Sequence, residues 1–305
     1  MTVTVDKANQ TALTVSSTNG TYGTNLTLAT GGGSTAGSVT WSVSDNTAAG
    51  CAITSGALRS TSAGTCTVTA TMAGSDNYNE VSSLATTVTL AVRPITVTVT
   101  AGQTKVYGQT DPSFAYTITS GDLVNSNTLS GALARAGGAS VGTYAINQGT
   151  LANSNYGVTF VPANFAITAK PITVTADVKT KVYGETDPAL TYSITTGGPL
   201  VGSDAFSGAL SRTGTDAVGT YTITQGSLAL SSNYTLTYQS ANFTITAKPI
   251  TVTATAGQTK VYGESDPTFA YTVTSGSLET GDSLSGALAR AGGASVGAYA
   301  INQGT

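Results

Sequence analysis

A threefold internal repeat constrains this chain more than any other feature of its sequence. Arg93, Lys170 and Lys248 each precede the letters "PITVT", at intervals of 77 and 78 residues. The motifs "KVYG", "DP" and "SGAL" then follow in the same order in each copy. A fixed period of this kind indicates one folded unit written several times. The sequence therefore predicts three repeats, 93–169, 170–247 and 248–305, after a different first domain, 1–92.

The third repeat is shorter than the other two. It stops at Thr305, the equivalent of Thr150, and has no counterpart of residues 151–169. A repeat without its last strands leaves a sheet edge uncovered. We therefore expect it to be C-terminally incomplete and the natural chain to continue. The opening "MTVTV" lacks the basic region and apolar core of a signal peptide, so we expect an internal piece of a longer protein.

The composition is typical of β-structure. Hydrophobic residues make up 40% of the 305 residues and charged residues only 9%, with 36 Gly. Thr, Ser, Val and Gly dominate, a mixture that favours twisted strands joined by tight turns. Lys and Arg number 12 against 15 Asp and Glu and never cluster, which argues against a nucleic-acid partner. No run of 18 apolar residues occurs, so no membrane insertion is expected in this segment.

Alternation within the strands predicts how the repeats are joined. Phe165 and Ile167 share one face of a closing strand, whereas Ile172 and Val174 share a face of the next opening strand. The apolar residues change from odd-numbered to even-numbered positions, so one uninterrupted strand could not bury both pairs on the same side of a sheet. We therefore expect the sheet to change at the Pro, without a flexible linker.

Joined in this way, the domains are expected to form an elongated array. Strands of roughly ten residues rising 3.3 Å per residue give domains of about 35–40 Å, and four in line give a rod of about 140–160 Å. The expected fold class is all-β, with tandem β-sandwich-type domains.

The first domain contains the segments "SVTWSVSD", "TVTATMAGSDNY" and "TTVTLAV", which have the spacing of β-sandwich strands. On these segments it resembles the bacterial immunoglobulin-like repeats of secreted surface proteins. Trp41 is its expected core aromatic. Cys51 and Cys66 are the only cysteines, and a disulfide is expected because both lie in one small extracellular-type domain. Two buried thiols that never pair remain the alternative.

The repeats contain a series of ordered motifs, seen in the second repeat as "KPITVTA", "KVYGETDP", "SGALSR", "AVGTYTI", "SSNYTLTY" and "ANFTITAKPI". On these motifs residues 93–305 resemble the MBG family, the mostly-β, glycine-rich domains of large bacterial surface proteins and adhesins. The resemblance implies an extracellular repeat architecture, at the bacterial cell surface or secreted, without enzymatic activity. It transfers no functional residue, because the family has no shared active site.

One motif could suggest catalysis, and one pair of acidic residues could suggest metal binding. "GASVG" at 138–142 and 293–297 fits the pattern of serine hydrolases, but the chain has no His, and a strand-like segment rather than a helix follows Ser140. We therefore expect a turn there, and no enzyme. No cofactor is expected, because His is absent and no calcium-loop pattern occurs. Calcium between domains, held by acids such as Glu185 and Asp187, stays open beside solvated turn carboxylates.

The nine-residue phrase "TKVYGETDP" at 180–188 recurs almost unchanged in all three repeats. We interpret it as a turn, in which Gly184 supplies a permissive backbone and Asp187-Pro188 starts the next segment. A sharper alternative is an isopeptide bond from Lys181 to an Asn such as Asn242. Such a bond needs a buried Lys, a catalytic acid and an apolar pocket.

Two functions remain after an enzyme is set aside. The chain is expected to be a stalk or spacer of an adhesin-like surface protein, with neighbouring domains of the same chain as partners. The alternative is a binding module that grips glycans or another copy through exposed Tyr and Asn loops. Exposed aromatic patches would favour binding, and Tyr side chains confined to cores and interfaces would favour the spacer.

Overall fold

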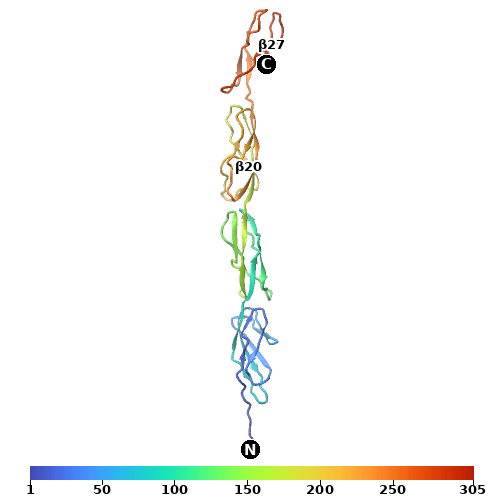
Figure 1. Cartoon of the computed structure of the whole chain (residues 1–305), viewed down its shortest axis with the longest axis vertical. Coiled ribbons are helices and arrows are strands. Elements are labelled where there is room, and N and C mark those ends of the chain that lie inside the picture. The colour runs from blue at the N-terminus through green and yellow to red at the C-terminus, as the bar shows by residue number, and fades with distance from the viewer. The chain divides into compact units, whose positions relative to one another are not determined.

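The computed structural model describes all residues, 1–305, and every regular element in it is a β-strand (Figure 1). The chain divides into two compact bodies, an N-terminal body of Met1–Ala169 and a C-terminal body of Lys170–Thr305. No helix long and apolar enough to cross a membrane is present. The all-β prediction is confirmed.

The first domain is built on one five-stranded sheet. The sheet runs in the order β2-β10-β8-β5, with β9 also paired to β8; its strands are β2 (Asn19–Thr21), β5 (Val39–Asp45), β8 (Gly64–Met72), β9 (Val81–Ser82) and β10 (Thr86–Ala91). Smaller sheets join β1 (Thr14–Val15) with β4 (Thr30–Gly31), and β3 (Leu26–Thr27) with β7 (Ala57–Arg59) and β6 (Ala52–Thr54). Alternate residues of β8 are buried, as period-two strands require. Trp41 packs, partly buried, against this core.

The first and second repeats share one topology of two mixed sheets. In the first repeat these are β13-β11-β16 and β12-β17-β15-β14; the strands are β11 (Arg93–Val99), β12 (Thr104–Val106), β13 (Tyr116–Ser120), β14 (Ala134–Arg135), β15 (Gly142–Asn147), β16 (Tyr156–Val161) and β17 (Ala163–Thr168). In the second they are β20-β18-β23 and β19-β24-β22-β21; the strands are β18 (Lys170–Ala176), β19 (Lys179–Val182), β20 (Tyr192–Thr196), β21 (Ser211–Arg212), β22 (Gly219–Thr224), β23 (Tyr234–Gln239) and β24 (Ala241–Thr246). The opening strand of each repeat pairs in parallel with the strand before the closing one.

The core of a repeat lies between its two sheets. Ile95 and Val97 of β11, in the three-stranded sheet, belong to the same buried cluster as Phe165 and Ile167 of β17, in the four-stranded sheet. The two sheets therefore pack face to face. The expected change of sheet between domains is also confirmed within the N-terminal body: β10 belongs to the first domain's sheet, β11 to the repeat's sheet, and only Val92 lies between them.

The third repeat has fewer paired strands. β25 (Thr251–Ala254) pairs with β26 (Tyr271–Ser275), and β27 (Leu288–Arg290) pairs with β28 (Ile301–Gln303). Each sheet of this repeat thus has two strands, where the second repeat has three and four.

Candidate functional site

The repeated phrase of the sequence contributes two charges to an ion-pair cluster. In the second repeat Lys181 Nζ lies 2.7 Å from Asp187 Oδ1, and Arg212 Nε donates a hydrogen bond of 2.6 Å to Asp187 Oδ2. Lys181 comes from the end of β19 and Arg212 from β21, so the carboxylate joins two segments of the four-stranded sheet. We name these three residues the Lys-Asp-Arg cluster.

Aromatic rings hold the arginine of this cluster in place. The Arg212 guanidinium lies 5.0 Å from the ring centre of Phe243 and 5.7 Å from that of Tyr221. Arg is well suited to this position, because its planar guanidinium can stack on rings while its edge donates to a carboxylate. The cluster therefore fastens the turn of the repeated phrase to the core strands β22 and β24.

The same cluster recurs in all three repeats. The corresponding residues are Lys105, Asp111 and Arg135 in the first repeat and Lys260, Asp266 and Arg290 in the third, with Lys–Asp distances of 2.6 Å in both. Only the second repeat adds another carboxylate, Asp216, which pairs with both Lys181 and Arg212. The repeated phrase is thus a structural clamp as well as a turn.

This finding extends the expectation about the turn acids. Asp187 is exposed, as expected of a turn carboxylate, with 41% of its side chain accessible, but it also pairs with two cations from different segments. Glu185 matches the expectation of local turn chemistry, since its carboxylate accepts a hydrogen bond of 3.0 Å from the backbone N–H of Val182. No group of three or more His, Cys, Asp or Glu side chains that could hold a metal ion occurs in the structure.

The cations lower the pKa of the cluster's carboxyl groups. Hydrogen bonds from Arg212 and then Lys181 lower the pKa of Asp187 to about 2. The pKa values of Asp111 and Asp266 are lowered by the matching Arg and Lys. Because the folded state holds these groups ionised more strongly than the unfolded chain does, they stabilise the fold above the unfolded pKa of about 4.

We expect this stabilisation to disappear on acidification. The melting temperature of the repeats should be steady from neutral pH down to about 4 and fall as pH drops further toward the folded-state pKa values. Asp187→Asn should flatten the acid slope of the second repeat. Calorimetry at a series of pH values measures the melting temperatures, and limited proteolysis assigns each transition to a repeat. An unchanged dependence of the melting temperature on pH in the variant would contradict the role of Asp187.

The first and second repeats provide a matched test of the cluster. Asp111→Asn leaves Lys105 and Arg135, both largely buried, without a carboxylate, and should destabilise the first repeat by about 1–2 kcal/mol after allowance for solvent screening. Asp187→Asn should have a smaller effect, because Asp216 still faces both cations. Urea unfolding followed by hydrogen exchange of each repeat measures both effects; a larger loss for Asp187→Asn would refute the compensation by Asp216.

The serine-hydrolase-like motif is a turn, as expected. Ser140 lies two residues before β15 (Gly142–Asn147), and its backbone carbonyl accepts a hydrogen bond of 2.7 Å from the Tyr144 hydroxyl. Gly138 has a φ of +139°, and a Cβ at this position would lie 2.2 Å from the Tyr144 ring. Glycine is needed there for the packing of Tyr144 against the backbone.

The structure separates the two residues of the isopeptide hypothesis. Lys181 is buried opposite Ile245 of β24 and also donates to the Glu185 carbonyl at 3.1 Å. Asn242 is exposed on the same strand, three residues before Ile245. An odd separation places the two side chains on opposite faces of the sheet. Alternate residues of a strand face opposite sides, so Asn242 does not reach Lys181. The pKa of Lys181 is raised by Asp187, which keeps the amine protonated and poorly nucleophilic.

Cys51 and Cys66 form a disulfide in the first domain, with a Cα–Cα distance of 6.1 Å. The bond ties the residue before β6 to the middle strand β8 of the five-stranded sheet. Between the two cysteines, β6 and β7 make a hairpin whose two turn residues, Ser55 and Gly56, both have positive φ. A two-residue turn of this kind matches the twist of paired strands.

A tyrosine of the first domain completes the core of the first repeat. Tyr22 is 0% exposed and belongs to the repeat's buried cluster, where its ring meets Tyr156 edge-on at 5.9 Å. Its hydroxyl accepts hydrogen bonds from the side-chain amides of Asn125, at 3.1 Å, and Asn127, at 2.9 Å. Asn155 accepts a further bond from the Ala63 backbone N–H at 2.9 Å. The joint between the two domains is therefore packed and hydrogen-bonded.

The Tyr-Gly pair of the repeated phrase makes a second joint, inside the C-terminal body. The Tyr183 hydroxyl donates to Asp282 of the third repeat at 3.4 Å, and the charge of Asp282 raises the pKa of Tyr183. Gly184 has a φ of +86°, and a Cβ there would lie 2.2 Å from Glu279 Oε1. Glu279 also pairs with Lys248, the residue that opens the third repeat. The phrase thus contacts the following repeat as well as its own core.

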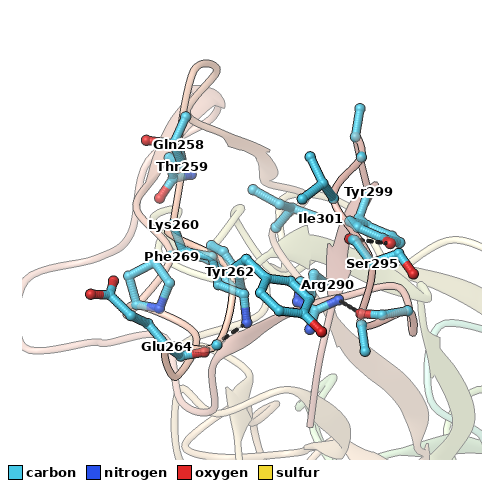
Figure 2. A pocket seen from close by; sticks show the side chains of 17 residues that line it. Gln258, Thr259, Lys260, Tyr262, Glu264, Phe269, Arg290, Ser295, Tyr299 and Ile301 are labelled. Carbon is cyan, nitrogen blue, oxygen red and sulfur yellow. Dashed lines mark hydrogen bonds between the residues drawn. The ribbon is translucent and has the colours of Figure 1, made fainter.

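In the third repeat the Lys-Asp-Arg cluster lies beside an open groove. A groove of about 640 Å³ is lined by Lys260, Tyr262, Phe269, Arg290, Tyr299 and Ile301, among others. Figure 2 shows Thr259 and Lys260 on one side of this groove and Tyr299 and Ile301 on the other. Arg290 stacks on Tyr299 at 5.1 Å, as its equivalents do on their tyrosines.

Sequence reasoning missed the arginine of the cluster and the tyrosine of the joint. The sequence did contain a signal for the arginine, because each repeat has an Arg at a nearly constant distance after the Asp of the repeated phrase. The spacing is 24 residues from Asp111 to Arg135, 25 from Asp187 to Arg212 and 24 from Asp266 to Arg290. Tyr22 had none, because it lies outside the repeats and its partners Asn125 and Asn127 are more than 100 residues away in sequence.

Comparison with known proteins gives one family. The family model described as MBG domain (YGX type) matches residues 95–166, 172–244 and 250–305. Residues 1–94 lie outside the matched segments. No curated protein matches the chain. Each matched segment contains one Tyr-Gly pair of the repeated phrase.

Proposed function

This chain belongs to the MBG domain (YGX type) family, and on that basis we propose that it is a non-enzymatic stalk segment of a large bacterial surface or secreted adhesin-like protein. Tandem MBG domains are typical of bacterial surface proteins. The stalk holds a more distal region of its protein away from the cell. Residues 1–92 act in it as an immunoglobulin-like domain that continues the array.

The joint at Tyr22 is the observation that carries this proposal. One residue, Val92, separates the last strand of the first domain from the first strand of the repeat. A fully buried side chain of one domain then fills the core of the next. A joint with a one-residue connection and a shared core resists bending. A spacer requires such stiffness, whereas a mobile binding module does not.

The positions of the tyrosines also favour a spacer over a binding module. Among the 14 tyrosines, only Tyr262 and Tyr271 are exposed, and both belong to the third repeat. Stacking platforms for glycans would need aromatic rings in solvent. The alternative, a module for glycan binding or self-association through exposed Tyr and Asn loops, therefore has support only in that repeat.

Several features argue against catalysis and for an extracellular location. The matched family is a non-catalytic repeat domain. The conserved charges within the repeats of this chain, such as Asp187, are held in ion pairs by Lys181 and Arg212. The disulfide of the first domain suits an oxidising, extracellular setting.

Small-angle scattering of the whole chain tests the stalk. The expected result is an extended particle close to the rod length derived from strand geometry, and a compact globe would contradict it. Tyr22→Ala should increase the spread of particle dimensions because the first joint loosens, whereas Asn19→Ala, an exposed change on β2, should not. Glycan-array binding by the intact chain, lost on mutation of Tyr271, would favour the binding module instead.

A further inference from the structure

The Lys-Asp-Arg clusters of the first two repeats differ by one carboxylate. In the second repeat Asp216 Oδ1 lies 3.1 Å from Lys181 Nζ and also accepts a hydrogen bond from Arg212 Nη2. The loop of the first repeat reads Gly-Gly-Ala-Ser where the second reads Gly-Thr-Asp-Ala, so Ala139 stands in the place of Asp216. Two cations face two carboxylates in the second repeat, whereas two cations share one carboxylate in the first.

Both cations of the first repeat keep the donors that Asp216 engages in the second. Arg135 donates from Nε and Nη2 to the Asp111 carboxylate, at 2.7 and 3.2 Å. Its Nη1 donates to two backbone carbonyls of the following loop. The second N–H of Nη2 therefore has no acceptor, and Asp111 is the one side chain paired with Lys105. These two donor groups correspond to the two that hold Asp216.

The structure fixes the two donors in position before any ligand arrives. The side chains of Lys105 and Arg135 are only 10% and 11% exposed. The Arg135 guanidinium also lies 4.9 Å from the ring centre of Tyr144 and 5.6 Å from that of Phe165. The place of the extra carboxylate is nevertheless at the surface, since 74% of the Asp216 side chain is exposed in the second repeat. Donors that are already ordered lose little freedom when they bind a group from solvent.

We propose that Lys105 and Arg135 form a carboxylate-binding site of the first repeat, which receives an acidic side chain of a partner protein. One carboxylate oxygen lies between Lys105 Nζ and Arg135 Nη2, as Asp216 Oδ1 does between the equivalent atoms. Hydrogen bonds between ionised groups are stronger than those between neutral groups. The occupant is an Asp or Glu side chain, because the second repeat fills this place with an Asp on an exposed loop. The stalk function does not require this binding activity.

A short peptide tests the proposal on the intact 305-residue chain. The peptide carries residues 213–218, "TGTDAV", with both termini blocked, so that its Asp is the only charged group. Titration followed by NMR should shift the Nε–H resonance of Arg135 and leave that of Arg212, whose site Asp216 already fills. The matched peptide with Asp216→Asn should shift neither resonance. An unchanged Arg135 resonance with the Asp peptide, or equal shifts with both peptides, would overturn the proposal.

A matched pair of lysine variants locates the site on the protein. Lys105→Gln removes one donor but leaves the pair of Asp111 with Arg135. It should weaken peptide binding by about tenfold, the effect of losing one charge-assisted hydrogen bond. Lys7→Gln removes the same charge from an exposed position of the first domain and should bind like the parent. The backbone amide spectrum checks that both variants stay folded. Equal affinities of the two variants would place the peptide elsewhere and contradict the proposal.

A gain of binding in the second repeat is the converse test. Asp216→Ala gives this repeat the cluster of the first, with two cations and one carboxylate, and should make the Arg212 resonance respond to the peptide. Val218→Ala, an exposed change in the same loop, should leave it silent. A silent Arg212 in the Asp216→Ala variant would refute the site. Sodium acetate at matched ionic strength tests the source of the carboxylate. If acetate shifts Arg135 and the peptide does not, the site admits only a free carboxylate and the proposed protein partner is wrong.

Discussion

Replacing Phe243 with alanine is expected to destabilise the second repeat by about 3–5 kcal/mol. Phe243 is completely buried between the two sheets of the repeat, and its ring also covers the Arg212 guanidinium. The change leaves a cavity at the centre of the core and removes one face of the stacked arginine. Urea unfolding, with hydrogen exchange to assign the transition, measures the loss.

Asn242→Ala is the control for this experiment. Asn242 precedes Phe243 on β24 and is exposed, so its replacement should change stability by no more than about 0.5 kcal/mol. The first domain should be unaffected by either change, since tandem repeats couple mainly through their neighbours. Similar effects of the two substitutions would show that β24 does not form the core of its repeat.

Loss of the disulfide is expected to have the second large effect. Replacing Cys51 and Cys66 with serine removes a bond across a sequence separation of 15, which contributes about 3 kcal/mol in the chain-entropy model. Cys66 is also fully buried, so serine places a hydroxyl in the core. The melting temperature of the first domain should fall, and that of the second and third repeats should stay nearly unchanged.

Calorimetry of the oxidised protein and of the double variant measures this difference. Reduction of the parent protein with a thiol reagent should reproduce the shift without any mutation. Labelling of both cysteines by a thiol reagent in the untreated, folded protein would refute the bond. A uniform fall in all transitions would contradict the independence of the domains.

Stability and joint rigidity can be separated in this chain, which matters for the stalk proposal. Phe243 and the disulfide lie within single domains, whereas Tyr22 lies at a joint. Core substitutions should lower unfolding free energy without changing the dimensions of the folded chain. Tyr22→Ala should change the dimensions, so scattering and unfolding together distinguish a weakened domain from a loosened joint.

The sequence by itself determined the features that depend on local alternation and on repetition. The period of 77–78 residues predicted three copies of one unit, and apolar alternation predicted strands throughout. The change of parity between Val88 and Leu90 on one side and Ile95 and Val97 on the other predicted a change of sheet. Each of these depends on residues within one strand or its neighbour, where the two-residue period of a strand fixes which side chains face the core.

Only the tertiary structure decided which distant residues meet. Asp187 pairs with Arg212 across 25 residues because β19, β24, β22 and β21 lie side by side, and the parallel pairing of β19 with β24 cannot be inferred from alternation. Tyr22 reaches the first repeat's core because the short joint at Val92 brings the end of β2 against residues 125–127. Alternation assigns a face to each side chain but no partner, because pairing order and joint geometry arise only when the sheets pack.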